Sequence, residues 1–437
     1  MKSPLKRKNN LDFVKTYLVG FIFFYLGLIT AIQGTTLLDL RIAVQTSLEN
    51  VMKTVPLRSL SFALGGFLTK HIKIELLMVI CLTIAGILSA LTPWNTTIYG
   101  LIACISVSGV TAGIIEVAGN YILLRIWKEK SAPLLQVLYF FFGLGAFVAP
   151  LITEPFLLPL HENHNSTLDL SNATVVKNYT PNDLKIQYPY GMIGVYCVLL
   201  AFVFFIVAHK YSGEKKKEMA KESTKCEETN AFSPKLKYLV VGLSALLIHF
   251  YFGVEFVAGT VLMPFAVQSS LHLQKSTAAF MTSIYWGIYT FFRLIAVVLT
   301  KKVSAHFVIT LELVFLICGC IGLIAGLKSI SIFWTGLVFV AIGVSTLFST
   351  LLGYLQLYFQ ITSKMLSLLF VVGCLGEFLY PFIAAMFIDV YPNIFLVIIS
   401  LASAMMSVLY IAISFLLRKP KNQNNTIITS YFYKMLK

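Results

Sequence analysis

Charged residues are scarce in this sequence, and acidic residues are fewer than basic ones. Only 12% of the 437 residues are charged, about half the share in an ordinary soluble domain. Hydrophobic residues make up 58% of the chain, and the mean hydropathy is +0.83. A soluble core of this chain length cannot bury so much apolar surface. The composition therefore argues against a soluble protein and predicts an all-α polytopic membrane protein.

The sequence also lacks a disulfide framework, a metal-ligand pattern and catalytic motifs. The seven cysteines lie in apolar runs, except Cys226 in a charged loop. Cys318 and Cys320 are too close together and too apolar for a metal site. His161 and His164 lack the spacing of a zinc motif, and no phosphate-binding Gly-Lys-Ser/Thr loop is present. We therefore expect no enzyme activity, catalytic residue, metal site or cofactor, and no ATP-driven pump.

Positive charge is abundant, and its distribution predicts a topology. The net charge is +15, but lysine and arginine cluster in alternate short loops between apolar runs. That distribution follows the positive-inside rule, so it predicts cytoplasmic termini and argues against a nucleic-acid partner. The first apolar run is too long for a signal peptide, so we expect it to be a retained span.

Twelve apolar stretches are long enough to cross a bilayer as helices. A polar, lysine- and glutamate-rich segment separates six of them from the other six, which predicts a flexible linker. We predict an N-terminal six-helix half at 1–209, a cytoplasmic linker at 210–236, a C-terminal six-helix half at 237–417 and a cytoplasmic tail at 418–437. The approximate limits of the spans are 13–38, 51–69, 74–92, 97–124, 131–156, 189–209, 237–264, 276–299, 303–327, 330–358, 364–389 and 392–417.

Glycosylation sequons agree with this topology. They begin at Asn95, Asn165, Asn172 and Asn178, all in loops predicted to be external. We therefore expect these four asparagines to carry glycans and the protein to lie in the plasma membrane.

Ionisable residues inside the predicted spans are the strongest functional signal. A charge within a bilayer is costly, so it marks a binding, coupling or gating site unless it only locks helices together. Matching depths in the membrane suggest two possible ion pairs, Arg58 with Glu255 and Arg293 with Glu116. Glu312 also lies in a predicted span, and the sequence offers no account of it. The candidate coupling or gating residues are Arg58, Glu116, Glu255, Arg293 and Glu377.

Neutral polar residues in the spans are candidates for binding a substrate. Amide pairs satisfy sugar hydroxyls, and an aromatic face stacks on a sugar ring. The alternative for each residue is hydrogen bonding between helices. Gly143 and Gly145 instead predict close helix packing. The candidate substrate residues are Gln33, Asn120, Gln136, Tyr251, Trp286 and Gln356.

Several motifs resemble, in the same order, those of one transporter group. They are Gly34-Thr-Thr-Leu-Leu-Asp39-Leu, Glu116-Val-Ala-Gly-Asn120, Leu123-Leu-Arg-Ile-Trp127, Gln136-Val-Leu-Tyr-Phe140, Gly143-Leu-Gly-Ala-Phe-Val-Ala-Pro150, Thr282-Ser-Ile-Tyr-Trp-Gly287 with Arg293, and Gly376-Glu377 with Pro381. Together they resemble the sodium-dependent glucose transporter 1 and domain-containing protein 4 group of the major facilitator superfamily. In that group Asp stands in place of Glu116, and His in place of Tyr139.

The resemblance implies a fold and a function. The fold would have twelve helices in two halves, and spans 1, 2, 4, 5, 7, 8, 10 and 11 would line a central path. The substrate would be a hexose, moved by alternating access and coupled to Na⁺. The alternatives are a proton-coupled or uncoupled carrier of another small polar solute, and a non-transporting receptor. We expect a small-molecule substrate and the lipid bilayer as partners, and a monomer.

Overall fold

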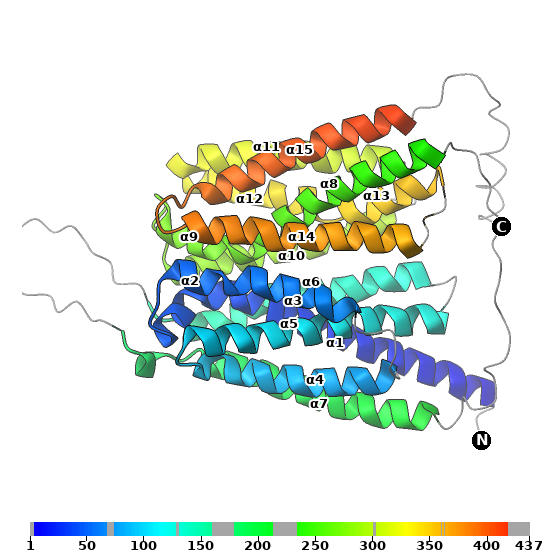
Figure 1. The fold of residues 1–437 in the computed structure, drawn as a ribbon, viewed down its shortest axis with the longest axis horizontal. Helices are drawn as coiled ribbons and strands as arrows, with labels where there is room; N and C mark the ends of the chain where they lie inside the picture. The colour runs from blue at the N-terminus through cyan, green and yellow to red at the C-terminus, as the bar shows by residue number, and fades with distance from the viewer. Residues whose placement is uncertain are drawn as a thin grey trace, which may run out of the picture.

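The computed structural model describes residues 4–67, 74–127, 131–159, 179–212, 234–299, 303–359, 361 and 363–417. Within these residues, ten helical segments are long and apolar enough to cross a membrane. The more polar α3 and α10 lie among them and complete the twelve predicted spans (Figure 1). The helices are α1 (Pro4–Ala43), α2 (Leu48–Met52), α3 (Thr54–Phe67), α4 (Ile74–Leu91), α5 (Ile98–Trp127), α6 (Ser131–Thr153), α7 (Gln187–Ser212), α8 (Pro234–Thr260), α9 (Leu262–Gln268), α10 (Lys275–Leu299), α11 (Ala305–Ala325), α12 (Ile330–Val344), α13 (Leu347–Gln356), α14 (Ser363–Phe387) and α15 (Ile394–Leu417).

The helices form two halves with the same internal packing, α1–α7 and α8–α15. In the first half α1 packs on α6, α3 on α5, and α4 on α7. In the second half α8 packs on α14, α10 on α12, and α11 on α15, which repeats the pattern. The halves meet along α6 with α10 and along α3 with α14 (Figure 1). This pseudo-two-fold arrangement confirms the predicted architecture.

Glycine allows the closest helix crossings at equivalent places in the two halves. A Cβ on Gly145 of α6 would overlap the Phe24 carbonyl oxygen of α1. A Cβ on Gly376 of α14 would overlap the His249 carbonyl oxygen of α8. Small residues let helix backbones approach in this way, and van der Waals packing then holds the helices together in lipid. The predicted packing role of Gly145 is confirmed.

Three predicted spans are interrupted where we expected continuous helices. The span predicted at 51–69 is divided at Lys53 into α2 and α3, and the span at 237–264 runs through α8 into the separate helix α9. The span at 330–358 breaks at Ser345 and Thr346, between α12 and α13. Hydropathy measures apolar length only, so it cannot detect a break made of small polar residues.

Polar contacts join the two halves at one end of the bundle, which we call the sealed end. Lys275, at the start of α10, forms a buried ion pair with Asp39 of α1. The other oxygen of Asp39 accepts a hydrogen bond from the backbone N–H of Leu158 at 3.0 Å. Beside this pair, the Ser276 hydroxyl donates to the carboxylate of Glu154.

A further contact seals the same end on the other side of the interface. The backbone N–H of Glu49 donates to Asp389 Oδ2 at 3.2 Å. The sealed end contains α2 and α9 (Figure 1), and its loops are those predicted to be external. The halves are therefore closed against each other at this end.

Candidate substrate and ion site

The five ionisable residues predicted from the sequence lie together between the two halves. They come from α3, α5, α8, α10 and α14. Glu377 interacts electrostatically with Glu255, Glu116 and Arg58, and Glu116 also interacts with Arg293. The group holds three carboxylates and two guanidinium groups, so the arginines leave one carboxylate unbalanced. We call this group the central cluster: Arg58, Glu116, Glu255, Arg293 and Glu377.

Arg58 is held within its own half and faces α14. Its guanidinium is 5% exposed and donates to the Thr30 hydroxyl of α1 at 2.9 Å. The carboxylate that interacts most strongly with it is Glu377. No ion pair joins Arg58 to Glu255 in the described part of the chain, so the predicted pairing is wrong. The two residues share a depth, but α3 packs against α14.

Arg293 is linked to Glu255 through a tyrosine. Its Nη2 donates to the Tyr289 hydroxyl, which in turn donates to the Glu255 carboxylate. The guanidinium also lies over the rings of Tyr289 and Tyr139, at 4.4 and 5.6 Å from their centroids. Among the described residues Arg293 forms no ion pair with Glu116, so the predicted direct contact is wrong.

Glu116 is positioned by residues of α5 and α6. The Tyr139 hydroxyl donates to Glu116 Oε1 at 3.3 Å. The Asn120 amide donates to that hydroxyl at 3.3 Å and to the Glu116 backbone carbonyl at 3.1 Å. Glu116 and Asn120 thus share one helix face, as their four-residue spacing predicts.

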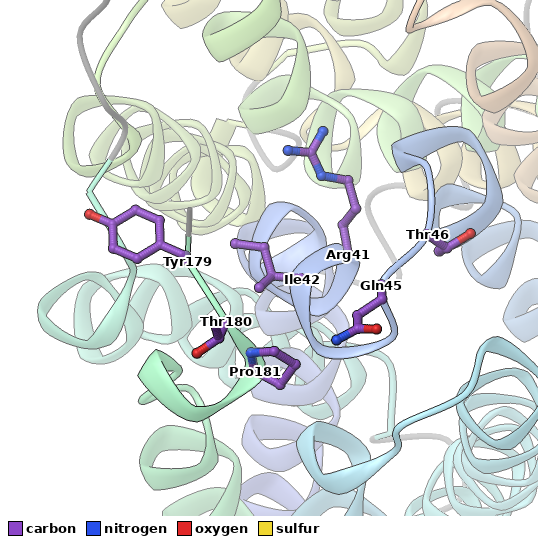
Figure 2. A pocket seen from close by; sticks show the side chains of 7 residues that line it. All are labelled: Arg41, Ile42, Gln45, Thr46, Tyr179, Thr180 and Pro181. Atoms are coloured by element: carbon purple, nitrogen blue, oxygen red, sulfur yellow. The ribbon is translucent and has the colours of Figure 1, made fainter. Parts of the chain in front are cut away.

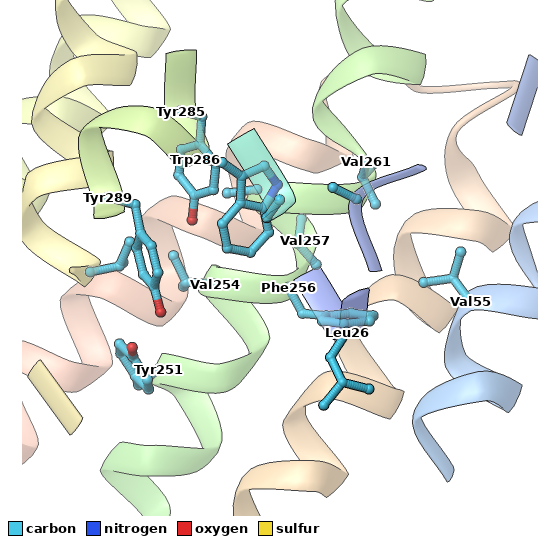
Figure 3. Close-up of a cluster of buried hydrophobic side chains, with 14 of the residues drawn as sticks. Leu26, Val55, Tyr251, Val254, Phe256, Val257, Val261, Tyr285, Trp286 and Tyr289 are labelled. Carbon is cyan, nitrogen blue, oxygen red and sulfur yellow. The ribbon is translucent and has the colours of Figure 1, made fainter. Parts of the chain in front are cut away.

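Aromatic residues of α8 and α10 form a buried wall (Figure 3), and two of them, Tyr251 and Tyr285, interact with Glu255 of the central cluster. The Trp286 ring lies 5.3 Å from the rings of Tyr285 and Tyr289, measured between centroids. Trp286 is 2% exposed and Tyr251 1%. Within the described structure neither Trp286 Nε1 nor the Tyr251 hydroxyl has a hydrogen-bond partner. Buried polar groups are normally satisfied, so these two point to a missing acceptor.

Comparison with known proteins fits this geometry. The model of the Major Facilitator Superfamily matches residues 57–381. The chain belongs to the Major Facilitator Superfamily. It is therefore a multi-pass membrane transporter for a small-molecule substrate, and not an enzyme.

Two curated relatives of this superfamily member are similar over most of their length. Human sodium-dependent glucose transporter 1 is 27% identical over 389 residues, which cover 85% of this chain and 73% of the relative. Major facilitator superfamily domain-containing protein 4A of Xenopus tropicalis is 22% identical over 405 residues, covering 79% of this chain and 80% of that protein. The group suggested by the sequence motifs is confirmed.

Solved structures of the superfamily share the fold. The xylose transporter XylE of E. coli, in a partially occluded inward open conformation, superposes with a TM-score of 0.67 at 12% identity. The alignment covers 95% of this chain and all of that chain. The nucleoside transporter NupG superposes with a TM-score of 0.60 at 14% identity and covers 93% of this chain.

The remaining predicted substrate residues of this superfamily member lie in different surroundings. Gln33 is 5% exposed and donates to the Thr54 hydroxyl at 3.3 Å, which joins α1 to α3. Gln136 is half-buried on α6, and Gln356 is exposed at the end of α13. The geometry of Gln33 is that of helix–helix hydrogen bonding, and roles for all three in binding stay predictions.

Sequence reasoning missed several residues that connect the site. Lys275 falls just outside the predicted span at 276–299, and Asp39 is present in the sequence analysis only within a motif. Tyr289 was not singled out, although it bridges Arg293 and Glu255. Its position four residues before Arg293 on one helix was a usable signal.

Of the predicted glycosylation sites, only Asn95 lies within the described residues. Its side-chain nitrogen, the atom a glycan would occupy, donates to the carbonyls of Leu91 and Thr92 at 3.2 and 3.0 Å. Glycosylation there would have to replace these helix-end hydrogen bonds. Asn165, Asn172 and Asn178 lie outside the described residues, as do the tail at 418–437 and most of the predicted linker.

A shallow pocket lies on the sealed end, apart from the central cluster (Figure 2). All of its lining residues belong to the first half, so it does not combine the two halves as the central cluster does. Among the described residues, no group of three or more His, Cys, Asp and Glu side chains could hold a metal ion. The lining residues are Arg41, Ile42, Gln45, Thr46, Tyr179, Thr180 and Pro181.

Proposed function

We propose that this protein moves a hexose such as glucose across the plasma membrane by alternating access, coupled to Na⁺. One observation carries the proposal. The central cluster and two unsatisfied aromatic donors converge between two halves that are closed at one end. The name of the human relative, sodium-dependent glucose transporter 1, supports both the sugar and the ion.

The aromatic wall supplies groups suited to a sugar. Trp286 Nε1 and the Tyr251 hydroxyl can each donate to a sugar oxygen without breaking a protein hydrogen bond. The indole face can stack on the apolar side of the sugar ring. The amide oxygen of Asn120 and the carboxylate oxygens can accept hydrogen bonds from sugar hydroxyls. A pocket with a few convergent polar groups and aromatic walls is typical of small-molecule sites.

The unbalanced carboxylate of the central cluster accounts for a coupling cation. A cation that binds there neutralises the excess charge and lowers the cost of keeping the cluster in the membrane. Glu116 is our candidate because Tyr139 holds it in place while no described basic residue pairs with it. A proton would neutralise the same carboxylate, so a proton-coupled carrier is the second candidate.

The buried pair of Lys275 and Asp39 accounts for gating. The loops at the sealed end are predicted to be external, so the described conformation would open toward the cytoplasm. Rocking of the halves would separate the two residues, expose both to water and open the opposite side. Water then replaces the lost partner of each charge, so the pair can break without leaving a buried, unpaired ion.

Uptake of radiolabelled glucose into proteoliposomes tests the proposal. We expect accumulation with Na⁺ outside and little with choline. Uptake that ignores Na⁺ but rises at acidic external pH would replace Na⁺ by protons. An absence of uptake for every hexose offered would overturn the sugar assignment, and an uncoupled leak of glucose would overturn the coupling.

A further inference from the structure

The tenth predicted span, at 330–358, is broken between α12 and α13. Charged side chains from two other helices bind the break. α12 ends at Val344 and α13 begins at Leu347. Ser345 and Thr346 lie between them, and both are buried. A break within a membrane frees backbone groups that need other partners.

One side of the break is bound by a residue of the central cluster. Arg293 Nε donates to the Ser345 carbonyl at 2.8 Å. The same guanidinium is linked through Tyr289 to Glu255. The position of Ser345 is therefore tied to the group where we place the substrate and ion.

The other side of the break is bound by Glu312, from α11. Its Oε1 accepts the Thr346 backbone N–H at 3.1 Å and also accepts the Thr346 hydroxyl. Glu312 is 5% exposed, and within the described structure its Oε2 has no hydrogen-bond partner. A carboxylate at the start of α13 also complements the positive end of that helix.

Glycine at the same level brings α12 close to α11. A Cβ on Gly343 would lie 2.7 Å from the Glu312 carbonyl oxygen. Beyond the break, the Ser349 hydroxyl donates to the Thr346 carbonyl at 2.9 Å. Backbone groups at the break thus have specific partners, so the break is not a frayed helix end.

We propose that Glu312 is a positioning residue for transport. Together with Arg293 it holds the break between α12 and α13 as a clamp. The position of α13 therefore depends on the hydrogen bonds within the central cluster. The hydrogen-bonded path runs through Glu255, Tyr289, Arg293, the break and Glu312. When Glu255 changes its partners, Arg293 loses its anchor and the Ser345 carbonyl is released. The proposal requires neither glucose nor Na⁺ to be the true ligand.

Hydrogen exchange of the full-length protein in lipid nanodiscs tests the clamp without any substrate. Glu312→Leu removes the acceptor of the Thr346 N–H, so exchange at residues 346–350 should accelerate roughly fivefold or more. Glu312→Gln keeps an oxygen that can accept the Thr346 N–H, and its NH2 group takes the place of Oε2, which has no described partner. Exchange should therefore stay near that of the unchanged protein. Equal exchange in the unchanged protein and both variants would overturn the role of Glu312.

A matched pair of tyrosine variants tests the path to the central cluster. Tyr289→Phe removes the bridge between Arg293 and Glu255. It should accelerate exchange at residues 346–350 by a similar factor, although Tyr289 does not bind the break. Tyr285→Phe is the control, because Tyr285 is equally buried on α10 and, among the described residues, its hydroxyl donates to the Glu255 backbone carbonyl and not to a side chain. Equal exchange in the two variants would overturn the coupling.

Exchange in α4 and α7 reports whether each variant is folded. These helices lie in the other half, so a clamp effect leaves their exchange unchanged. If Glu312→Leu accelerates exchange there too, it has unfolded, and the test rests on the two tyrosine variants. Absence of glucose uptake by the unchanged protein would count against the proposed function. It would not affect the exchange results at residues 346–350, which test the clamp.

Discussion

Glu116 is the carboxylate to which we assign ion coupling in the proposed function. It is half-buried between the halves, and its described hydrogen-bond donor is a neutral tyrosine. A lock between the halves would instead place an arginine or lysine against it. An acid held in position by a neutral donor keeps its charge available for a mobile cation.

Glu116→Gln should separate coupling from movement of the substrate. The amide keeps an oxygen for the Tyr139 hydroxyl but cannot take up a charge. We expect Na⁺-driven accumulation of glucose to be lost, while counterflow exchange of labelled for unlabelled glucose continues. Glu49→Gln is the control, because Glu49 is 40% exposed and pairs with Lys53 outside the central cluster. Accumulation that survives unchanged in Glu116→Gln would make Glu116 a structural residue.

Tyr251→Phe should distinguish a substrate donor from a structural one. Its hydroxyl makes no hydrogen bond of ordinary geometry in the described protein, so removing it should lower the melting temperature less than removing the Tyr289 hydroxyl does. The KM for glucose should rise roughly threefold to tenfold, as the loss of one neutral hydrogen bond predicts. Tyr289→Phe provides the contrast, since its hydroxyl is bonded on both sides and its loss should lower the melting temperature. An unchanged KM in Tyr251→Phe would remove this residue from the site.

The sequence predicted which charges lie together better than it predicted their partners. The free-energy cost of a charge in lipid identifies Arg58 and Glu377 from the sequence alone. A charged residue within a span is rare unless it has a function or a partner. Depth in the membrane follows from position along a span. The direction in which a side chain points around its helix does not, so Arg58 was matched with Glu255 although α3 packs on α14.

The number of membrane-spanning helices could be predicted from the sequence, whereas the breaks within them could not. Apolar length fixes a span because the bilayer has a fixed thickness. The break at Ser345 and Thr346 contains neither glycine nor proline, and only partners from α10 and α11 explain it. Glu312, unexplained as an isolated charge, is one of those partners.

Close crossing at glycine gives a prediction for the elements. Gly145→Ala forces a Cβ against the Phe24 carbonyl, so α1 and α6 must separate. We expect a loss of about 1–3 kcal/mol in stability, which a lower melting temperature in detergent would report. Gly242→Ala on α8 is the control, because nothing lies within 4 Å of its added Cβ. Equal melting temperatures for the two variants would contradict the packing account.

At the scale of the whole molecule, one symmetry relates the two halves and one end is closed. Equivalent helix pairs pack in each half, and residues from both halves build the central cluster. The motifs and the polar linker predicted this division from the sequence. They could not predict the closed end, because the contact of Lys275 with Asp39 joins residues 236 positions apart.

Cross-linking the sealed end tests alternating access most directly. Glu154 and Ser276 hydrogen-bond there across the two halves. With the exposed Cys318 replaced by serine, Glu154→Cys and Ser276→Cys together should be joined by a short bis-methanethiosulfonate cross-linker, which forms a disulfide with each cysteine that reduction cleaves. A cysteine pair at Glu49 and Lys53, within one half, serves as the control. We predict that the cross-link between halves stops glucose uptake, that reduction restores it, and that the control pair has no effect. Full uptake with the sealed end cross-linked would contradict a mechanism in which the halves rock around the central cluster.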